Sequence, residues 1–216
     1  MEVVHPTGIM RVSDVVRLLE DEINFGLLPA GTWLKQADLE RRLNCSRLLL
    51  REALNRLDEK GLVSLEVNRG YRVREMDERR LLQILQIRSL LEAEAIKEVA
   101  AHAEDLDFDE LHRLAENFRS LVEYGTVIEQ EHANRSFHSA LLQVCPNEEL
   151  VSLIFELRNR APVSQNRRKN THARLVRSAQ EHFKILELLQ AHDVYVVREL
   201  LIHHVLGIEG SRNETT

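Results

Sequence analysis

Hydrophobic and polar positions follow two different patterns along this chain. From Ile23 to Val73, short apolar runs alternate with turn residues in the order of a short helix, a turn, a longer helix and a hairpin closed by Gly70. From Asp77 onward, apolar residues recur at intervals of three and four, and proline and glycine become rare. The pattern predicts a mainly α fold with a small N-terminal domain and an all-helical C-terminal domain.

The longer N-terminal helix is predicted to run from Ser46 to Lys60. The Ser46 hydroxyl can cap the first free backbone N–H groups, and Gly61 tolerates the left-handed conformation that follows a helix end. The predicted buried stripe consists of Leu50, Ala53, Leu54 and Leu57. The opposite face carries Arg47, Leu48, Arg51 and Asn55. This order of elements predicts a winged helix-turn-helix whose exposed helix face would meet DNA.

The charge of this segment agrees with that interpretation. From Arg41 to Arg74 there are nine Lys or Arg residues and four Asp or Glu residues. Arginine can read guanine edges or clamp phosphate with two parallel hydrogen bonds. The alternative is a charged, solvated helix face that binds nothing.

The first third of the chain resembles the GntR family of bacterial transcription regulators in two runs, LNCSRLLLREALNRLDEKGLV and NRGYRV. The resemblance implies that Arg47 and Arg51 contact bases or phosphates in the major groove, and that Arg69 and Gly70 form a wing tip at the minor groove. The predicted DNA-contacting residues are Ser46, Arg47, Leu48, Arg51, Asn55, Arg69 and Gly70. Ala37 and Leu48 stand where the family commonly has polar DNA-contacting residues, so we expect an operator that differs from the family norm.

Composition and charge favour two domains. A chain of 216 residues with 44% hydrophobic content can bury one large core or two small ones, and the change from hairpin to helix near Arg74 favours two. We predict a DNA-binding domain over residues 1–76 with a flexible arm up to Met10, an effector-binding and dimerisation domain over 77–209, and a flexible tail over 210–216. The net charge is −6, but residues 1–76 hold twelve basic and twelve acidic residues, so the acidic surplus belongs to the C-terminal domain.

Several features bear on the location of the protein and on its core. Cys45 and Cys145 lack CxxC spacing, so we expect neither a disulfide framework nor a zinc knuckle. Apolar runs fall short of the roughly twenty residues that a membrane span needs. Without a signal peptide, the protein is expected to be soluble and cytoplasmic.

Trp33 is expected to anchor the core between the first two helices.

The C-terminal domain is predicted to contain about six helices, joined mostly by short loops. They span residues 77–104, 107–124, 127–144, 148–160, 172–190 and 193–206. Short connections place successive helices antiparallel, and the resulting bundle can hold a ligand in its core.

The chemistry of this domain lies in its histidines. Asn134 and His138 are four residues apart, which places both on one helix face. His182 and His204 flank a short turn, and at about 1.5 Å of rise per residue they reach similar depths on two antiparallel helices. Four polar groups can therefore point at one centre in the bundle.

The helical domain also resembles the FCD effector domain, which accompanies winged helices in the FadR-like subfamily. The matching runs are R-x-x-LE from Arg88, FH-x-x-L from Phe137, PN-x-x-L from Pro146 and EH-x-x-IL from Glu181. Six helices rather than seven suggest its VanR-like branch. The resemblance implies that His138, His182 and His204 are metal ligands, with Asn134 in the position of a ligating aspartate.

Asn134 would weaken such a metal site, because an amide oxygen is a neutral and poorer ligand than a carboxylate. Three imidazoles still suit zinc or nickel, and an open position could accept a carboxylate from an anionic effector. Arg88 is expected to bind that effector together with Asn134, since an unpaired arginine is costly to bury. The alternatives are a polar pocket of neutral histidines without an ion, and a structural ion pair between Arg88 and Glu92.

These features together predict a ligand-responsive transcription regulator. We expect a repressor that binds a short inverted repeat in double-stranded DNA as a homodimer and responds to a small organic acid in a metal-containing pocket. One alternative is a metal sensor in which the ion is the effector. The other is a metal-dependent enzyme, but the sequence offers no HExxH pair and no activated serine or cysteine, so we expect no catalysis.

Overall fold

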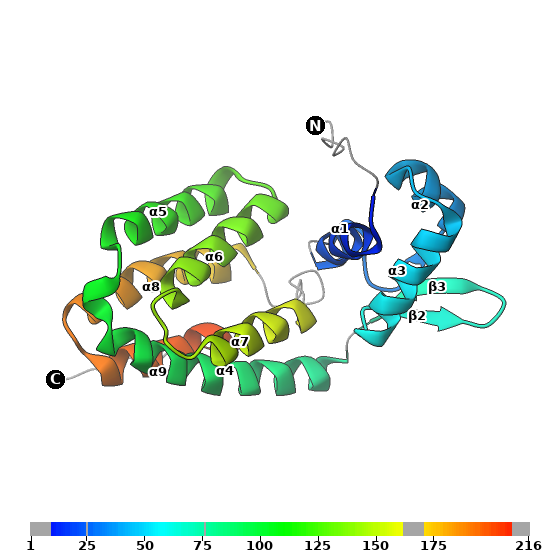
Figure 1. Ribbon diagram of the computed structural model, residues 1–216. Helices are drawn as coiled ribbons and strands as arrows, with labels where there is room; N and C mark the ends of the chain where they lie inside the picture. Colours follow the sequence, from blue (N-terminus) through cyan, green and yellow to red (C-terminus); the bar gives the residue numbers. More distant parts are fainter. Residues whose placement is uncertain (1–9, 25, 76, 162–170, 209–216) are drawn as a thin grey trace. The chain divides into compact units, whose positions relative to one another are not determined.

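The computed structural model describes residues 10–24, 26–75, 77–161 and 171–208. Its contacts divide the chain into two compact units, Met1–Met76 and Asp77–Thr216. The described residues form nine α-helices, one short 3₁₀ helix and a three-stranded sheet (Figure 1). The mainly α fold with a winged helix-turn-helix and a C-terminal helical domain is therefore confirmed. Apart from Met10, the terminal arms predicted to be flexible lie outside the described residues.

The first unit packs three helices against a small sheet. The helices are α1 (Val12–Asn24), α2 (Gln36–Leu43) and α3 (Arg47–Glu59), and the strands are β1 (Trp33–Leu34), β2 (Val63–Glu66) and β3 (Gly70–Val73). Both strand pairs are antiparallel, in the order β1-β3-β2. Apolar side chains of α1 and α3 meet in the core, where Leu19, Ile23, Leu50 and Leu54 are fully buried.

Helix α3 begins and ends as its sequence predicts. The Ser46 hydroxyl accepts a hydrogen bond from the backbone N–H of Leu49 at 3.3 Å, and Gly61 adopts a φ of 76° beyond the helix end. The predicted stripe is fully buried at Leu50, Ala53, Leu54 and Leu57. Burial of this stripe turns the opposite face of α3 to solvent.

Strands β2 and β3 form the wing, a hairpin that extends away from α3 (Figure 1). Glu66 pairs with Gly70 across the turn, and Gly70 has a φ of 99°. A side chain at this position would be strained, because L residues rarely adopt such a conformation. The glycine therefore determines the shape of the wing tip.

Trp33 does not anchor the core, contrary to the expectation from sequence. Its side chain lies in β1 and is 38% exposed, and the Arg72 guanidinium of β3 lies 5.9 Å from the ring centroid. The next residue, Leu34, is buried instead. Successive residues of a strand point to opposite faces, so only one of the two can enter the core.

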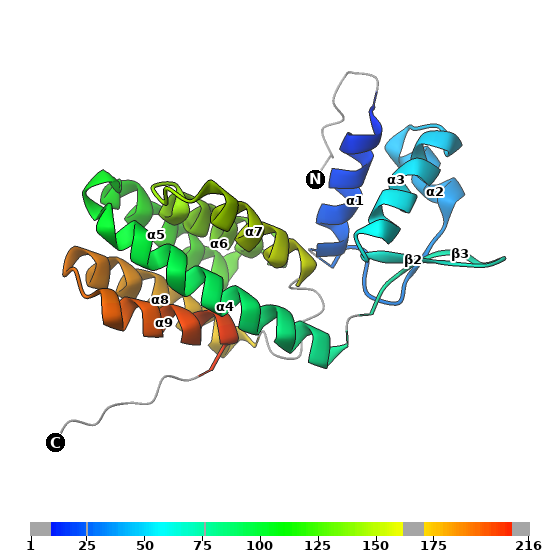
Figure 2. The same cartoon turned by 60° about the horizontal axis from the view of Figure 1, so that its bottom comes forward.

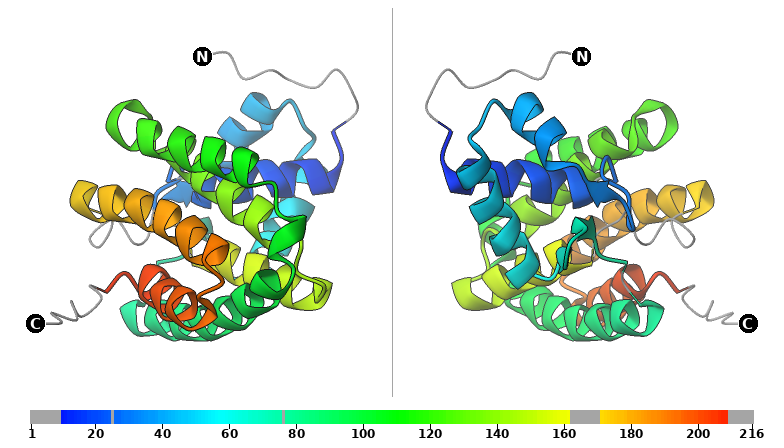
Figure 3. Two further views of the ribbon diagram at one scale, coloured as in Figure 1. Left: turned by 90° about the vertical axis from the view of Figure 1, so that its left-hand side faces the viewer. Right: turned by 90° about the vertical axis from the view of Figure 1, so that its right-hand side faces the viewer.

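The second unit is a bundle of six α-helices in the described part of the chain. They are α4 (Glu78–Ala101), α5 (Phe108–Tyr124), α6 (Val127–Leu142), α7 (Glu148–Arg160), α8 (His172–Gln190) and α9 (Val194–Leu206), with the 3₁₀ turn η1 (Ala103–Asp105) between α4 and α5. Helix α4 packs along α9 and α7, and α5 packs against α6 and α8 (Figure 2, Figure 3). None of the described helices is both long enough and apolar enough to span a membrane.

The core of this bundle contains polar as well as apolar side chains. Its largest fully buried apolar residues include Phe118, Phe137, Ile96, Leu111, Ile154 and Ile185. Glu92, His138, His182 and His204 are buried in the same unit. Burying such groups is costly unless they have partners, so they mark the region where chemistry is expected.

Candidate functional site

Helix α3 exposes the side chains predicted to face DNA. Arg47, Leu48 and Arg51 are all exposed, Leu48 at 78%. Among the described residues, no carboxylate pairs with Arg47 or Arg51, whereas Arg56 pairs with Glu52 at 2.8 Å. The first two turns of α3 therefore present two uncommitted guanidinium groups and one large apolar side chain to solvent.

Asn55 and Arg69, both predicted to contact DNA, differ in how much of each side chain remains available for such a contact. The Oδ1 of Asn55 accepts a hydrogen bond from the hydroxyl of Tyr71, a buried residue of β3. The Arg69 guanidinium at the wing tip is 72% exposed and lies 3.9 Å from Glu66. Arg69 thus keeps an accessible charge. The exposed Asn55 has its oxygen engaged by Tyr71 and its amide nitrogen available as a donor.

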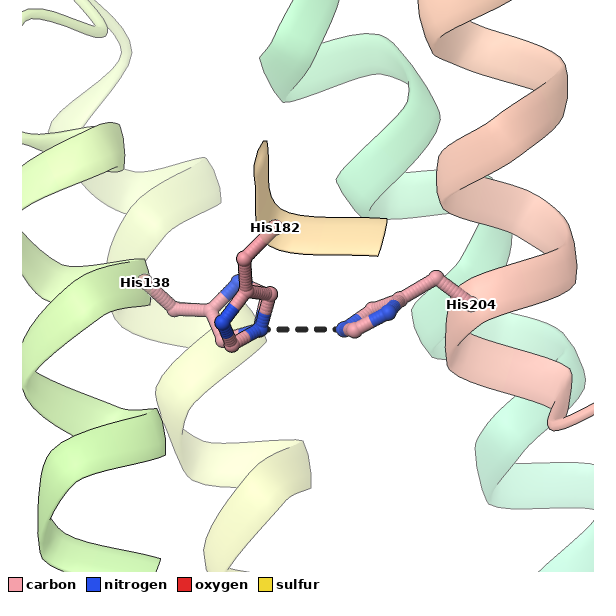
Figure 4. Close-up of side chains that lie close together, drawn as sticks. All are labelled: His138, His182 and His204. Atoms are coloured by element: carbon pink, nitrogen blue, oxygen red, sulfur yellow. Dashed lines mark hydrogen bonds between the residues drawn. The ribbon is translucent and has the colours of Figure 1, made fainter. Parts of the chain in front are cut away.

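Three buried histidines meet in the second unit. His138 comes from α6, His182 from α8 and His204 from α9, and their rings converge (Figure 4). The Nε2 atoms of His138 and His204 lie 3.2 Å apart, and one nitrogen from each ring lies within 4.8 Å of the others. The structure brings together the three histidines that the sequence singled out.

The hydrogen bonds of this cluster leave several polar atoms without partners. Nδ1 of His204 lies 2.7 Å from Oε2 of Glu181, so Nδ1 carries the proton and Nε2 keeps its lone pair. Both ring nitrogens of His182 are buried with no hydrogen-bond partner among the described residues. Oδ1 of Asn134, one helical turn before His138, is also buried and unpaired. Each unpaired buried polar atom costs about 1–3 kcal/mol, so the described part of the chain does not satisfy this cluster by itself.

The surroundings favour neutral imidazoles. The His182 ring stacks on Phe137 with centroids 4.0 Å apart. Burial lowers the pKa of His138 and His182 well below the ordinary value, and neighbouring positive groups act in the same direction. Burial also lowers the pKa of His204, although its contact with Glu181 opposes the change. Neutral imidazole is the form that binds metal ions.

A cavity of about 380 Å³ borders His204, one of the three clustered histidines. Its apolar wall includes Leu82, Leu85, Phe118, Val127, Leu175 and Leu206. Its polar wall includes Arg88, Glu131, Asn134, Arg158, Arg174 and His204. Arg88 and Asn134, the two residues predicted to bind an effector, both border this cavity.

Two arginines of the cavity wall share one carboxylate. Arg158 donates two hydrogen bonds to Glu92, from Nε to Oε1 at 3.1 Å and from Nη2 to Oε2 at 2.9 Å. Nε of Arg88 lies 3.0 Å from Oε1 of Glu92, although no hydrogen bond forms. Burial lowers the pKa of Arg88 to about 10, with Glu92 opposing the shift, so Arg88 stays protonated near neutral pH. Arg88 therefore lines the cavity and also forms the ion pair that the sequence left as an alternative.

Four charged residues of the site were not found from the sequence, namely Glu131, Arg158, Arg174 and Glu181. Arg174 lies 3.2 Å from Glu181 and donates a hydrogen bond to the backbone oxygen of His204. Spacing along the helices could have identified two of these four residues. Arg174 precedes His182 by about two turns on one face of α8, and Glu131 precedes His138 by about two turns on one face of α6. Arg158 gave no such signal, since α7 carries none of the predicted ligands.

Two family models match the chain. The model described as bacterial regulatory proteins, gntR family, matches residues 11–73, and the model of the FCD domain matches residues 83–207. A relative from Paenarthrobacter nicotinovorans, named probable D-xylose utilization operon transcriptional repressor, is 27% identical over 85% of this chain and 80% of its own length. The uncharacterized HTH-type transcriptional regulator BphR of Paraburkholderia xenovorans is 29% identical over 87% of this chain and 79% of its own length.

Solved structures share the fold. McbR/YncC of E. coli superposes with a TM-score of 0.78 and 25% sequence identity, covering 92% of this chain and 94% of that chain. A GntR transcriptional regulator from Rhodococcus sp. RHA1 has a TM-score of 0.74 and 22% identity, covering 90% and 93%. Both sequence relatives named above are described as regulators of transcription rather than as enzymes.

Proposed function

The chain belongs to the GntR family of bacterial regulatory proteins and carries an FCD domain, and from this premise we propose that it is a metal-containing repressor controlled by a small organic acid. Regulation of transcription follows from the family and from the names of the relatives. Repression is proposed because one relative is named as a repressor. The remaining parts of the proposal rest on the exposed face of α3 and on the histidine cavity.

The exposed face of α3 supports operator binding through the major groove. Arg47 and Arg51 stand one helical turn apart, so both can reach neighbouring base pairs or phosphates. Arg69 offers a positive charge to the phosphate backbone or the minor groove. A second copy of the chain would present the same groups to the other half of an inverted repeat, which is why we propose a homodimer.

The histidine cluster fits a divalent ion such as zinc or nickel. In a tetrahedral site with Zn–N bonds of about 2.0–2.1 Å, ligand nitrogens lie roughly 3.3 Å apart, close to the 3.2 Å between His138 Nε2 and His204 Nε2. The unpaired nitrogens of His182 and the unpaired Oδ1 of Asn134 supply further donors. Glu181 holds His204 in the tautomer that keeps the Nε2 lone pair available. When bound, such an ion would offer an open coordination position to a carboxylate.

The cavity is suited to a small anionic effector. Its volume of about 380 Å³ is near the lower end of the range of about 300–1,000 Å³ typical of small-molecule sites. Arg88 and Arg158 share the single carboxylate of Glu92, so a bound carboxylate would balance the remaining positive charge. Asn134 borders the same cavity and its amide nitrogen can donate a hydrogen bond to that ligand.

Control of DNA binding requires two states of the dimer that differ in operator affinity. A ligand shifts the balance between them only by the difference in its own affinity for the two states. Residues of all six described helices of the second unit, α4 to α9, border the cavity, so an acid bound there can change the packing of the whole bundle. We propose that the acid-bound state has the lower affinity for the operator.

The observation that carries this proposal is the convergence of three buried imidazoles within 4.8 Å of one another, one of which, His204, borders an arginine-lined cavity. The test begins with elemental analysis of the purified protein. Fluorescence anisotropy then measures operator binding with a chelator, and separately with acetate, succinate and citrate. We expect an acid to weaken operator binding, and chelation to abolish the response to acid while operator binding itself survives. His172→Gln, which changes an exposed histidine of α8, is the matched control for His182→Gln.

The other outcomes separate the alternatives. Loss of operator binding on chelation alone, without any effect of acids, would favour a metal sensor in which the ion is the effector. A metal content far below one ion per chain, together with no metal binding in titration, would contradict the metal part of the proposal. In that case the cavity would be a polar, metal-free pocket.

A further inference from the structure

Helix α3, which is proposed to read DNA, carries a large apolar side chain on its exposed face. Leu48 lies in the first turn of α3 and is more exposed than any other leucine in the described part of the chain. Single exposed apolar residues are common on protein surfaces and by themselves indicate nothing. Leu48 differs from them because its surface is the one that the proposed function assigns to DNA.

The buried stripe of α3 determines where on the exposed face Leu48 lies. The stripe consists of the fully buried side chains of Leu50, Ala53, Leu54 and Leu57. A rotation of α3 about its axis would expose them, so the helix is held in one orientation. At about 100° of rotation per residue, Leu48 lies roughly opposite the middle of the stripe. Leu48 therefore occupies the centre of the exposed face rather than its edge.

The neighbours of Leu48 leave the N-terminal end of this face apolar at its centre. Arg51 and Glu52, about one turn further along α3, lie on either side of the line through Leu48. Asn55 continues that line about two turns beyond Leu48, and its oxygen accepts a hydrogen bond from Tyr71. In helix-turn-helix proteins the N-terminal residues of the reading helix contact the base edges. Leu48 is therefore placed to meet a base.

The side chain of leucine suits only one of the groups that the major groove displays. It has neither a donor nor an acceptor, so it can hydrogen-bond neither a phosphate nor the polar edge of a base. Against a polar edge it would displace water from base donors and acceptors without replacing their hydrogen bonds. The C5-methyl group of thymine is apolar, and its contact with leucine removes apolar surface of both partners from water.

We propose that Leu48 is a specificity-determining residue that selects thymine in each half-site of the operator by contact with the C5-methyl group. This inference rests on the proposed function, which places the exposed face of α3 in the major groove. Arg51 lies about one turn away on the same face and can bind a neighbouring base or phosphate. Each half-site therefore holds a thymine that Leu48 recognises through its methyl group rather than through its hydrogen-bonding atoms.

The test removes methyl groups from the operator one position at a time. The full-length protein first selects its preferred sequence from a pool of random duplex DNA. Each thymine position is then changed to deoxyuridine in both half-sites, which keeps the pairing with adenine but removes the C5-methyl group. Fluorescence anisotropy at one salt concentration measures the affinity. Burial of one methyl group is worth about fourfold in affinity, so we expect one position at which the change in both half-sites weakens binding by about tenfold or more.

A variant of Leu48 identifies the side chain that makes the contact. Leu48→Ala should remove most of the difference between thymine and deoxyuridine at that position, because the alanine side chain is too short to reach the methyl group. Folding should be unaffected, since Leu48 is exposed, and thermal unfolding checks this. The matched control is Leu27→Ala, which shortens another exposed leucine of the first unit, between α1 and β1, and should keep the full difference.

The other outcomes distinguish failure of this inference from failure of the proposed function. If the parent binds its selected operator equally well after every change to deoxyuridine, Leu48 does not read a methyl group. The inference is also overturned if Leu48→Ala keeps the parental difference between thymine and deoxyuridine. In both cases the selected operator still binds, so recognition of DNA by the first unit stands. If the protein selects no sequence from the pool, the inference fails together with the operator-binding part of the proposed function.

Discussion

The hydroxyl of Tyr71 in the wing strand β3 donates a hydrogen bond to Oδ1 of Asn55 in α3, which joins the wing to the helix proposed to read DNA. We expect Tyr71→Phe to lower the free energy of unfolding by about 1 kcal/mol, the usual net value of one hydrogen bond. The wing should also be held less firmly, so operator binding should weaken moderately. Urea unfolding and fluorescence anisotropy measure the two effects. Parental operator affinity in this variant would show that the contact does not position the wing.

Arg47 and Arg51 provide the most direct test of operator recognition. Loss of a bidentate base contact costs about 1–3 kcal/mol, so Arg47→Ala and Arg51→Ala should each weaken operator binding by roughly tenfold or more. Folding should be unaffected, because both side chains are exposed. Arg113→Ala, which removes an exposed arginine of α5, is the matched control. Unchanged affinity of both variants at one salt concentration would remove α3 as the reading helix.

Arg69 should contribute to DNA affinity through its charge rather than by recognising particular bases. If its guanidinium contacts phosphate, Arg69→Ala should flatten the dependence of log affinity on log salt concentration by about one unit of slope. The loss should be similar for specific and non-specific DNA. A salt series measured by anisotropy checks this, and an identical slope in parent and variant would mean that the wing tip stays clear of the backbone.

Asn134 allows metal and effector binding to be changed in opposite directions. Asn134→Asp supplies a charged ligand oxygen, so metal affinity should rise. The same negative charge should weaken the binding of an anionic effector beside the ion and Arg88. Isothermal titration with zinc or nickel, and then with organic acids, measures both affinities. Two affinities that rise together would argue against a shared site.

The buried histidines should make the metal-free protein sensitive to acid. Burial lowers the pKa of His138, His182 and His204 in the folded state, so below the ordinary value of about 6.5 the unfolded chain binds more protons. The free energy of unfolding should therefore keep its full value above that pH and should decrease as the pH falls below it. Urea unfolding of the chelated protein between about pH 7.5 and 5 tests this. His182→Leu should flatten the profile, while His172→Gln should leave it unchanged.

Helix α3 could be predicted from sequence because its determinants are local. The cap at Ser46, the turn residue Gly61 and the stripe at Leu50, Leu54 and Leu57 all belong to one short segment. Trp33 could not be placed this way. Its two-residue strand has no periodicity to read, and its exposure is decided by pairing with β3, far along the chain.

In the bundle, spacing along each helix identified which residues share a face but not what they meet. Asn134, His138, His182 and His204 were singled out because their spacing and family resemblance pointed to one centre. The sharing of Glu92 by Arg88 and Arg158 depends on how α4 and α7 are rotated about their axes. That rotation is set by packing of the whole core, which a single sequence does not specify.

The location of the cavity on α4 also bears on how a signal could leave the second unit. Leu82, Leu85 and Arg88, which border the cavity, all belong to the first half of α4. Only residues 74–77 lie between the end of β3 at Val73 and the start of that helix at Glu78. A ligand that shifts α4 therefore acts on the helix that is joined to the wing strand by only four residues of sequence.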